Sequence, residues 1–179
     1  FSKSPLPKIL ALPANASAIG HYRVTQPLLE LEAADRVRGR IYYNRPSIIE
    51  IERLSPDVIV LQGRYSEGLI NEIPVFRTYS NARRIYELDD YVINVPQRNA
   101  HIRNMPGSDD MEKLVRRAIG MCDRVVVSTE ALGNALSDMH DDIRVVPNML
   151  AKHLWSDMPS QRRTSKKPRV GWGGGTSHH

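Results

Sequence analysis

The sequence is poor in cysteine and has no long apolar run. Its 179 residues include a single cysteine, Cys122, so no internal disulfide can form, which fits a reducing compartment. The neighbouring Ala118 and Met121 predict that this thiol is buried and structural rather than reactive. No stretch approaches the roughly 18–20 consecutive apolar residues that span a bilayer, so a transmembrane helix is not expected.

The sequence also gives little support for a metal site or a nucleic-acid-binding surface. The six histidines show no metal-ligand spacing, and no metal site is expected. The net charge is +5, but much of it comes from one Pro- and Ser-containing stretch that holds Arg162, Arg163, Lys166, Lys167 and Arg169. No aromatic residues interleave these charges, as a nucleic-acid stacking surface requires. A solvated linker is the favoured interpretation, and no nucleic-acid partner is expected.

The composition is that of an ordinary globular domain. Hydrophobic residues make up 41% and charged residues 25%, far from the signature of disorder. A length of 179 residues is about one domain, which buries enough surface to need neither a disulfide nor a metal.

Short apolar runs alternate with helical segments, which is the pattern of parallel strands joined by crossover helices. Strands are predicted at 8–13, 40–43, 57–61, 84–88, 124–127 and 143–146. The run from Val58 to Leu61 has no polar face, as expected for a strand buried on both sides. The expected fold class is therefore α/β, a Rossmann-like open, mostly parallel sheet with helices on both faces.

The first two helices are predicted from periodicity and caps. A loop over 14–23 is expected before a helix whose apolar residues share one face, Val24, Leu28 and Leu31. Ser47 and Glu50 form a capping box that begins a second helix, and Ser55-Pro56 ends it near Leu54.

The later segments are less regular. A helix over 66–82 is expected to be interrupted at Pro74, and residues 97–110 are predicted to form a long surface loop. Asp109 and Glu112 read as a second capping box, followed by an apolar stripe of Met111, Leu114, Val115, Ala118 and Cys122. Ser128 and Thr129 are placed to cap a helix that runs to about residue 139.

The character of the chain changes after residue 151. Residues 152–168 are polar, basic and proline-bearing, as in a linker. Residues 169–172 read as a new strand that runs into a glycine turn. We therefore expect an N-terminal domain over 1–151, a basic linker over 152–168, and the start of a truncated second domain over 169–179.

Six short segments, taken in order, carry a resemblance to a known family. They are 20–23, 54–60, 86–90, 122–129, 145–148 and 170–178. Together they resemble the family 4 ("group 1") glycosyltransferases of the GT-B fold, and the resemblance covers essentially the whole chain. No single segment is specific, but their order and spacing are.

In that family, two Rossmann-like domains face each other across a cleft. The second domain binds the nucleotide sugar, and the first binds the acceptor. The resemblance implies transfer of a sugar from a nucleotide diphosphate sugar to a glycan or lipid-linked acceptor, in a cell-envelope polysaccharide pathway. It also implies a cytoplasmic location with peripheral contact at the inner face of the membrane, and no cofactor. The family's acidic motif belongs to the second domain, so this chain is expected to be inactive alone and its catalytic residues are unknown.

The candidate donor-phosphate residues are glycines and hydroxyl residues at turns. Gly20 lacks a Cβ and precedes a helix, so its backbone can approach a phosphate, although such a glycine is often only a turn residue. Glycine-rich turns after strands converge amides on a diphosphate. The candidates are Gly20, Gly173, Gly174, Gly175, Thr176 and Ser177.

The candidate acceptor-binding residues lie where strands of an open parallel sheet end. They are His21, Tyr22, Arg23, Tyr65, Asp89 and Asp90. The guanidinium of Arg23 can pair with a phosphate or carboxylate, or form a surface ion pair. The pair Asp89-Asp90 suggests a Mg²⁺ site. GT-B enzymes generally need no metal, however, so acceptor binding or a structural role is preferred.

Two other classes of protein fit parts of the pattern. A flavodoxin-like or Rossmann module that binds a small ligand without chemistry has the same strand pattern. A receiver of this type needs an acidic cluster after the first strand, where Pro13-Ala14-Asn15 stands instead. A dinucleotide-binding domain is disfavoured, because no helix, second strand or acidic residue follows the glycine turn at 173–175.

Overall fold

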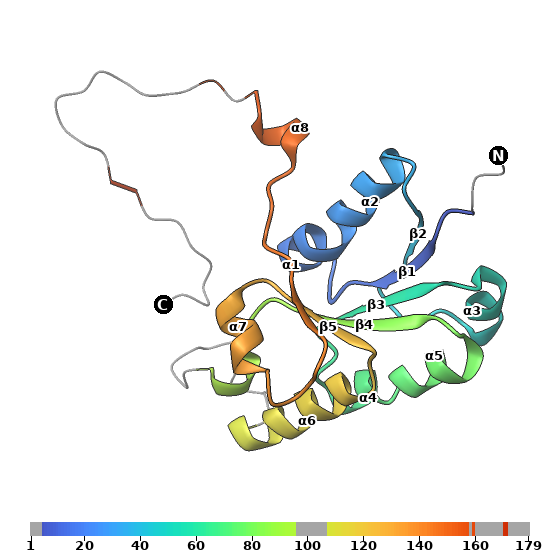
Figure 1. The fold of residues 1–179 in the computed structure, drawn as a ribbon, viewed down its shortest axis with the longest axis vertical. Helices are drawn as coiled ribbons and strands as arrows, with labels where there is room; N and C mark the ends of the chain where they lie inside the picture. The colour runs from blue at the N-terminus through green and yellow to red at the C-terminus, as the bar shows by residue number, and fades with distance from the viewer. Residues whose placement is uncertain (1–4, 96–106, 158, 160–169, 172–179) are drawn as a thin grey trace.

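The structure, a computed structural model, describes residues 5–95, 107–157, 159, 170 and 171. Six strands form one sheet: β1 (Lys8–Leu12), β2 (Arg38–Ile41), β3 (Val58–Gln62), β4 (Arg83–Leu88), β5 (Arg124–Val127) and β6 (Ile143–Val145). Their order in space is β2-β1-β3-β4-β5-β6, and every neighbouring pair is parallel (Figure 1). The predicted α/β, Rossmann-like fold class is confirmed.

Helical segments connect the strands. They are α1 (Ala18–Gly20), the π-helix η1 (His21–Thr25), α2 (Gln26–Ala33), α3 (Ile48–Leu54), α4 (Glu67–Ile70), α5 (Ile73–Tyr79), the 3-10 helix η2 (Val92–Asn94), α6 (Ser108–Gly120), α7 (Glu130–Ala135) and α8 (Lys152–Trp155). The connection from β1 to β2 runs one way along the sheet, and those after it run the other way. Right-handed crossovers therefore place α2 on one face and α3 to α7 on the other.

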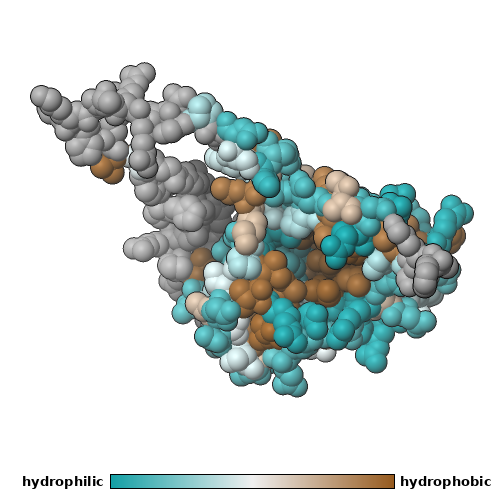
Figure 2. Space-filling view, turned by 45° about the horizontal axis from the view of Figure 1, so that its top comes forward, coloured by the Kyte–Doolittle hydropathy of each residue, from teal (hydrophilic) through white to brown (hydrophobic). Residues whose placement is uncertain are grey.

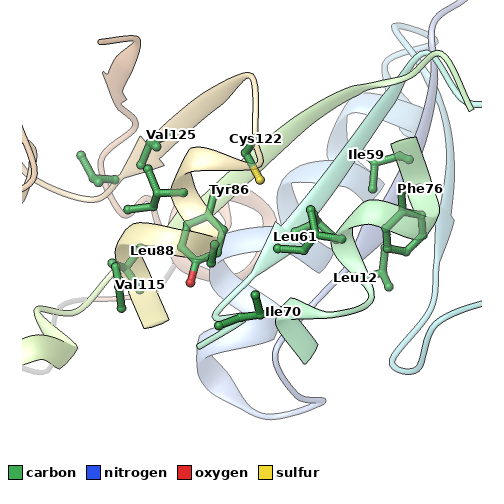
Figure 3. Packing of buried hydrophobic residues seen from close by; sticks show 14 of the residues in the cluster. Leu12, Ile59, Leu61, Ile70, Phe76, Tyr86, Leu88, Val115, Cys122 and Val125 are labelled. Carbon is green, nitrogen blue, oxygen red and sulfur yellow. The ribbon is translucent and has the colours of Figure 1, made fainter. Parts of the chain in front are cut away.

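The two faces carry cores of different size. The larger core lies between the sheet and α3 to α7 and includes Leu12, Ile59, Leu61, Tyr86 and Val125 (Figure 3). The smaller core lies under η1 and α2 and consists of Ala11, Val24, Leu28 and Val37. Because side chains alternate along a strand, neighbours such as Leu12 and Ala11 belong to opposite faces. We call these faces the α3–α7 face and the α2 face.

Several predicted elements are confirmed. Strand β5 has the expected bounds, and β1, β3, β4 and β6 lie within one residue of theirs. The first capping box is present, since Ser47 N donates to Glu50 Oε2 over 2.8 Å and Ser47 Oγ accepts from Glu50 N over 3.3 Å. Cys122 is only 7% exposed, and burial raises its pKa to about 12, so the prediction of a structural thiol is confirmed.

The predictions for the first helix and for β2 are wrong in detail. The loop predicted over 14–23 is interrupted by a helix that begins at Ala18. Of the predicted apolar stripe, Val24 and Leu28 are buried but Leu31 is 42% exposed. Strand β2 lies two residues earlier than predicted, because it pairs with β1 from Arg38 onward. A Cβ at Gly39 would lie 2.8 Å from Cγ of Leu28, so the glycine makes room for α2 on this strand.

Three later predictions also need correction. The predicted interruption of the helix over 66–82 is confirmed, since two helices form, but the break comes before Pro74, which lies in the first turn of α5, where no N–H is lost. The second capping box is wrong, because α6 begins at Ser108 with Gly107 as its N-cap and Asp109 lies in the first turn. Helix α7 ends at Ala135, four residues early, although Thr129 caps it as predicted, accepting from Leu132 N over 3.2 Å.

Parts of the predicted loop and of the second domain lie outside the described residues. Of the loop over 97–110, residues 97–106 are not described, and 108–110 belong to α6. Within the predicted linker, α8 is a short helix, and Val170 and Gly171 belong to no strand, with Val170 96% exposed. In the described part of the chain, no helix has the length and apolar character needed to cross a membrane.

Candidate functional site

The first helix is anchored where the chain changes direction across the sheet. This point lies between β1 and β3, and open parallel sheets bind ligands beyond the carboxyl ends of such strands. Ala14 N donates to Gln62 Oε1 over 3.0 Å, and Gln62 Nε2 donates to the carbonyl of Ile19 over 3.3 Å. Gln62, at the end of β3, thus holds the turn after β1 and the start of the first helix.

Gly20 lies inside this helical segment, with φ −63° and ψ −36°. A Cβ at this position would lie 1.9 Å from the carbonyl oxygen of Asn15 and 3.1 Å from Cβ of Pro13. The glycine is therefore required for close packing of the helix on the preceding turn. The expectation that Gly20 sits in a loop is wrong, and its contact with a donor phosphate stays a prediction.

Arg23, on the π-helix η1, spans the gap between β4 and the end of β6. Its Nε donates to Glu87 Oε1 over 2.6 Å, and its Nη1 donates to the carbonyl of Val146 over 2.6 Å and to Asn148 Oδ1 over 3.0 Å. The Arg23 and Glu87 side chains are only 4% and 3% exposed. The ion pair is therefore buried, which excludes the surface ion pair considered as an alternative.

This buried pair is not fully satisfied. Burial raises the pKa of Glu87 to about 7, although the charge and hydrogen bond of Arg23 oppose the rise. Glu87 Oε2 is buried and has no hydrogen-bond partner among the described residues. Arg23 Nη2 makes no hydrogen bond to a described residue, but it is not one of the buried polar atoms that lack a partner. Unused polar groups in a buried setting are costly for folding alone and are typical of functional sites.

An open pocket of about 260 Å³ lies beside Arg23, and we call it the Arg23 pocket. It is lined by Ala18, Ile19, Tyr22, Arg23, Asp89, Asn148, Met149 and Leu150. Polar groups come from Arg23 and Asp89, and apolar ones from helix α1 and the segment after β6. The ring of His21 meets that of Tyr22 edge-on, with centroids 5.2 Å apart. Three of the six predicted acceptor-binding residues therefore line one pocket.

Tyr65 and Asp90 do not line this pocket, but the charge of Asp89 affects Tyr65 and that of Asp90 affects Asp89. Burial raises the pKa of Asp89, and the charge of Asp90 raises it further. Burial also raises the pKa of the Tyr65 hydroxyl, with added effects from Asp89 and Asp90. Ser128 Oγ fixes the end of β4 by donating to the carbonyl of Asp89 over 2.9 Å. No group of three or more His, Cys, Asp or Glu side chains in the described ranges is placed to hold a metal ion.

The sequence reasoning missed Glu87 and Asn148. Glu87 interrupts the apolar run of β4, and its position between Tyr86 and Leu88 places it on the α2 face, which is a signal that alternation could have used. Arg64 is 3% exposed and donates from Nη2 to the carbonyl of Leu12 over 3.4 Å, while its Nε has no partner among the described residues. Burial lowers the pKa of Arg64.

Other candidate positions lie elsewhere. Gly173, Gly174, Gly175, Thr176 and Ser177 fall outside the described residues. A second pocket of about 240 Å³ lies at the opposite, amino edge, between Lys8, Arg38, Arg40 and Leu54. Because ligands of parallel sheets bind at the carboxyl edge, we regard the Arg23 pocket as the candidate site.

The fold and this edge define an α/β domain with a six-stranded parallel sheet. No protein-family model matches the sequence, and no curated protein or solved structure matches the chain. The structure gives the fold class, and the pocket and the sequence resemblance are the observations that bear on function.

Proposed function

We propose that this chain is the acceptor-binding domain of a GT-B glycosyltransferase. The enzyme transfers a sugar from a nucleotide diphosphate sugar to a glycan or lipid-linked acceptor. The observation that carries this proposal is the Arg23 pocket, which combines a tyrosine ring, a carboxylate and an arginine with an apolar wall at the carboxyl edge of a parallel sheet. The six sequence segments that resemble family 4 glycosyltransferases support it independently.

The polar side of the pocket suits a sugar. Sugar hydroxyls can donate to the carboxylate of Asp89 and accept from Nη2 of Arg23, and the ring of Tyr22 can cover an apolar C–H face. Glu87, Val146 and Asn148 fix the Arg23 guanidinium before any ligand binds. Such preorganisation lowers the entropy cost of binding.

The apolar side of the pocket suits a lipid. Ile19, Met149 and Leu150 are 40%, 69% and 64% exposed, which is unusual for large apolar side chains around one pocket. An acceptor that joins a sugar to an alkyl chain contacts both sides at once. The pocket therefore favours a lipid-linked acceptor over a free glycan.

Binding of simple glycosides tests the acceptor site. Methyl and hexyl glycosides of glucose, galactose and mannose are titrated into the isotope-labelled chain and followed by NMR. We expect shifts at Tyr22, Arg23 and Asp89, with the hexyl compound binding more tightly than the methyl compound. Asp89→Asn and Tyr22→Ala should abolish the shifts. Tyr79→Ala, which alters an equally exposed tyrosine on α5, should not. Equal loss in the control, or no shift with any glycoside, would refute the proposed site.

Turnover separates an enzyme domain from a binding module. The chain alone, incubated with nucleotide diphosphate sugars and a hexyl glycoside, should release no nucleoside diphosphate, because the resemblance assigns the donor site to a second domain. Joined to such a domain, it should turn over, and Asp89→Asn should raise KM for the acceptor. Glycoside binding without turnover in any such polypeptide would favour the small-ligand-binding module.

A further inference from the structure

The described helices leave part of the α2 face uncovered. On this face η1 and α2 pack on β1 and β2, and α3 to α7 lie on the other face. Val60, Ile85 and Val126 point to the α2 face from three neighbouring strands and are only half-buried, and Val60 packs against the edge of the smaller core. Figure 2, turned toward the side that carries α2, shows a hollowed apolar area bordered by hydrophilic side chains. All-parallel sheets normally have both faces covered by helices, but no helix among the described residues covers this area.

Three arginines border the uncovered area at the amino edge of the sheet. Arg83, Arg124 and Arg144 come from β4, β5 and β6 and are 56%, 31% and 64% exposed. They share one carboxylate, because Asp142 lies 3.8 Å from Arg83 and 2.9 Å from both Arg124 and Arg144. Asp123 at the same edge pairs with Arg84 and also interacts with Arg83. Two acids, Asp123 and Asp142, therefore face four arginines, which leaves this border with a net positive charge.

We propose that this surface binds an amphipathic α-helix of a partner polypeptide, with Asp or Glu residues at the end that meets Arg83, Arg124 and Arg144. A helix about 10 Å wide matches the layer that covers a sheet elsewhere in the molecule. Its apolar stripe would pack on Val60, Ile85 and Val126, and its acidic end would neutralise the arginines. None of these surface residues lines the Arg23 pocket, so the inference does not rest on the proposed function.

Charge or burial excludes the occupants that this chain itself could provide. The segment 162–169 contains five basic residues, which the arginines would repel. Helix α6 is the longest described helix and has acidic residues in its first turn, but its apolar side chains Met111, Val115 and Ile119 are already buried in the larger core. A second copy would face the arginines with its own.

Two designed peptides test the proposal directly. Both have about 18 residues and the same stripe of leucines along one helix face. They differ only at one end, where one peptide has Glu residues and the other has Lys residues. With fluorescence anisotropy at low salt, we expect the Glu peptide to bind the chain about tenfold or more tightly than the Lys peptide. The preference should shrink at about 0.3 M NaCl, because salt screens exposed charges.

Variants locate the binding surface. Arg144→Gln should weaken the Glu peptide several-fold, and Val126→Thr, which keeps the side-chain shape, should weaken both peptides. Arg38→Gln is the matched control, since Arg38 is also 64% exposed but lies on β2 and points to the other face. Equal binding of the two peptides, or an equal loss with Arg38→Gln, would overturn the proposal. Self-association of the chain that Val126→Thr abolishes would also overturn it, because a second copy would then occupy the surface.

Discussion

Arginine pairs with an acid at both edges of the sheet, but in opposite environments. At the amino edge, Arg84 donates to both oxygens of Asp123 over 2.8 and 3.1 Å, and the Asp123 side chain is 36% exposed. Its partial burial raises its pKa, but the hydrogen bonds from Arg84 outweigh this and lower the pKa overall. At the carboxyl edge, Glu87 is almost fully buried, and burial outweighs Arg23, so the pKa rises.

The two pairs differ in how well the fold compensates for their burial. Asp123 also accepts from the backbone N of Arg84 over 2.7 Å, so the amino-edge pair fixes the start of β4 at little cost. The Arg23–Glu87 pair is desolvated on both sides and leaves polar atoms unused. An apolar pair of similar size would fold as well or better. Its presence is consistent with a binding role at the carboxyl edge.

The largest expected difference in unfolding free energy is between variants that break the Arg23–Glu87 pair and variants that break the Arg84–Asp123 pair. Arg23→Met removes the partner of a buried acid and should lower the free energy of unfolding by about 3 kcal/mol. Arg84→Met should cost about 1 kcal/mol, since water can solvate Asp123. Urea denaturation measures both. The double variant Arg23→Met/Glu87→Gln should recover much of the loss, and equal costs at the two edges would contradict the comparison.

A second comparison is between two glycine-to-alanine substitutions, one at a closely packed position and one at an open position. Gly20→Ala places a methyl group against the carbonyl of Asn15 and should cost about 2–3 kcal/mol, because the turn after β1 must move. Gly68→Ala, in α4, meets nothing within 4 Å and should be neutral or stabilising by up to about 1 kcal/mol. Thermal or urea unfolding of the two variants compares them. Tolerance of Gly20→Ala would mean that this turn is not closely packed.

The pH dependence of stability should differ in sign at the two edges. The raised pKa of Glu87 means that the folded state binds its proton more tightly than the unfolded state. Its contribution is therefore present below about pH 4.5 and is lost as the pH rises through 7. Relative to Glu87→Gln, the wild type should lose on the order of 2 kcal/mol between these values.

The matched amino-edge variant is Asp123→Asn. The pKa of Asp123 is lowered, so its stabilisation should be present above the unfolded pKa and lost on acidification. Unfolding free energies measured from pH 3 to 8 for both variants and the wild type test this. Parallel pH curves for the two variants would contradict the assignment.

The smallest expected effects are those of Ser128→Ala and Thr129→Ala, two neighbouring substitutions at the carboxyl edge. Thr129→Ala removes the N-cap of α7 and should cost about 1 kcal/mol without changing glycoside affinity. Ser128→Ala releases the carbonyl of Asp89 and should weaken glycoside binding more than it lowers stability. NMR titration and urea unfolding of the same two proteins give both readouts. Weaker glycoside binding in Thr129→Ala would place the cap in the site.

The strands could be predicted where a run of apolar residues is too short for a helix and has to be buried in the sheet. Strands β1, β3, β4 and β5 fit that condition, whereas β2 has one neighbour and only one apolar residue, Ile41, so its bounds were missed. The start of the first helix was missed because Ser17 makes no side-chain cap and a π-helix follows. Local sequence carries no signal for either feature.

The pocket could be predicted only in part. Tyr22, Arg23 and Asp89 were expected at one edge because they lie at a helix start or a strand end. The partners of Arg23 could not be predicted, since Glu87 and Asn148 are 64 and 125 residues away in the chain. Such pairings depend on the order of strands in the sheet and on a helix turning its side chain toward β4, and neither is encoded locally.

The position of β1 between β2 and β3 has a consequence for biosynthesis. This strand is translated before the other strands of the sheet, yet its Leu10 and Leu12 are buried only when β3 and the helices after it are in place. Roughly 50 residues must follow β1 before β3 is complete, which takes on the order of 3–10 s on the ribosome. During that time β2 is the only neighbour that β1 can pair with, so the edge of β1 that later pairs with β3 stays unpaired, and such an exposed apolar strand is the kind of segment that chaperones bind.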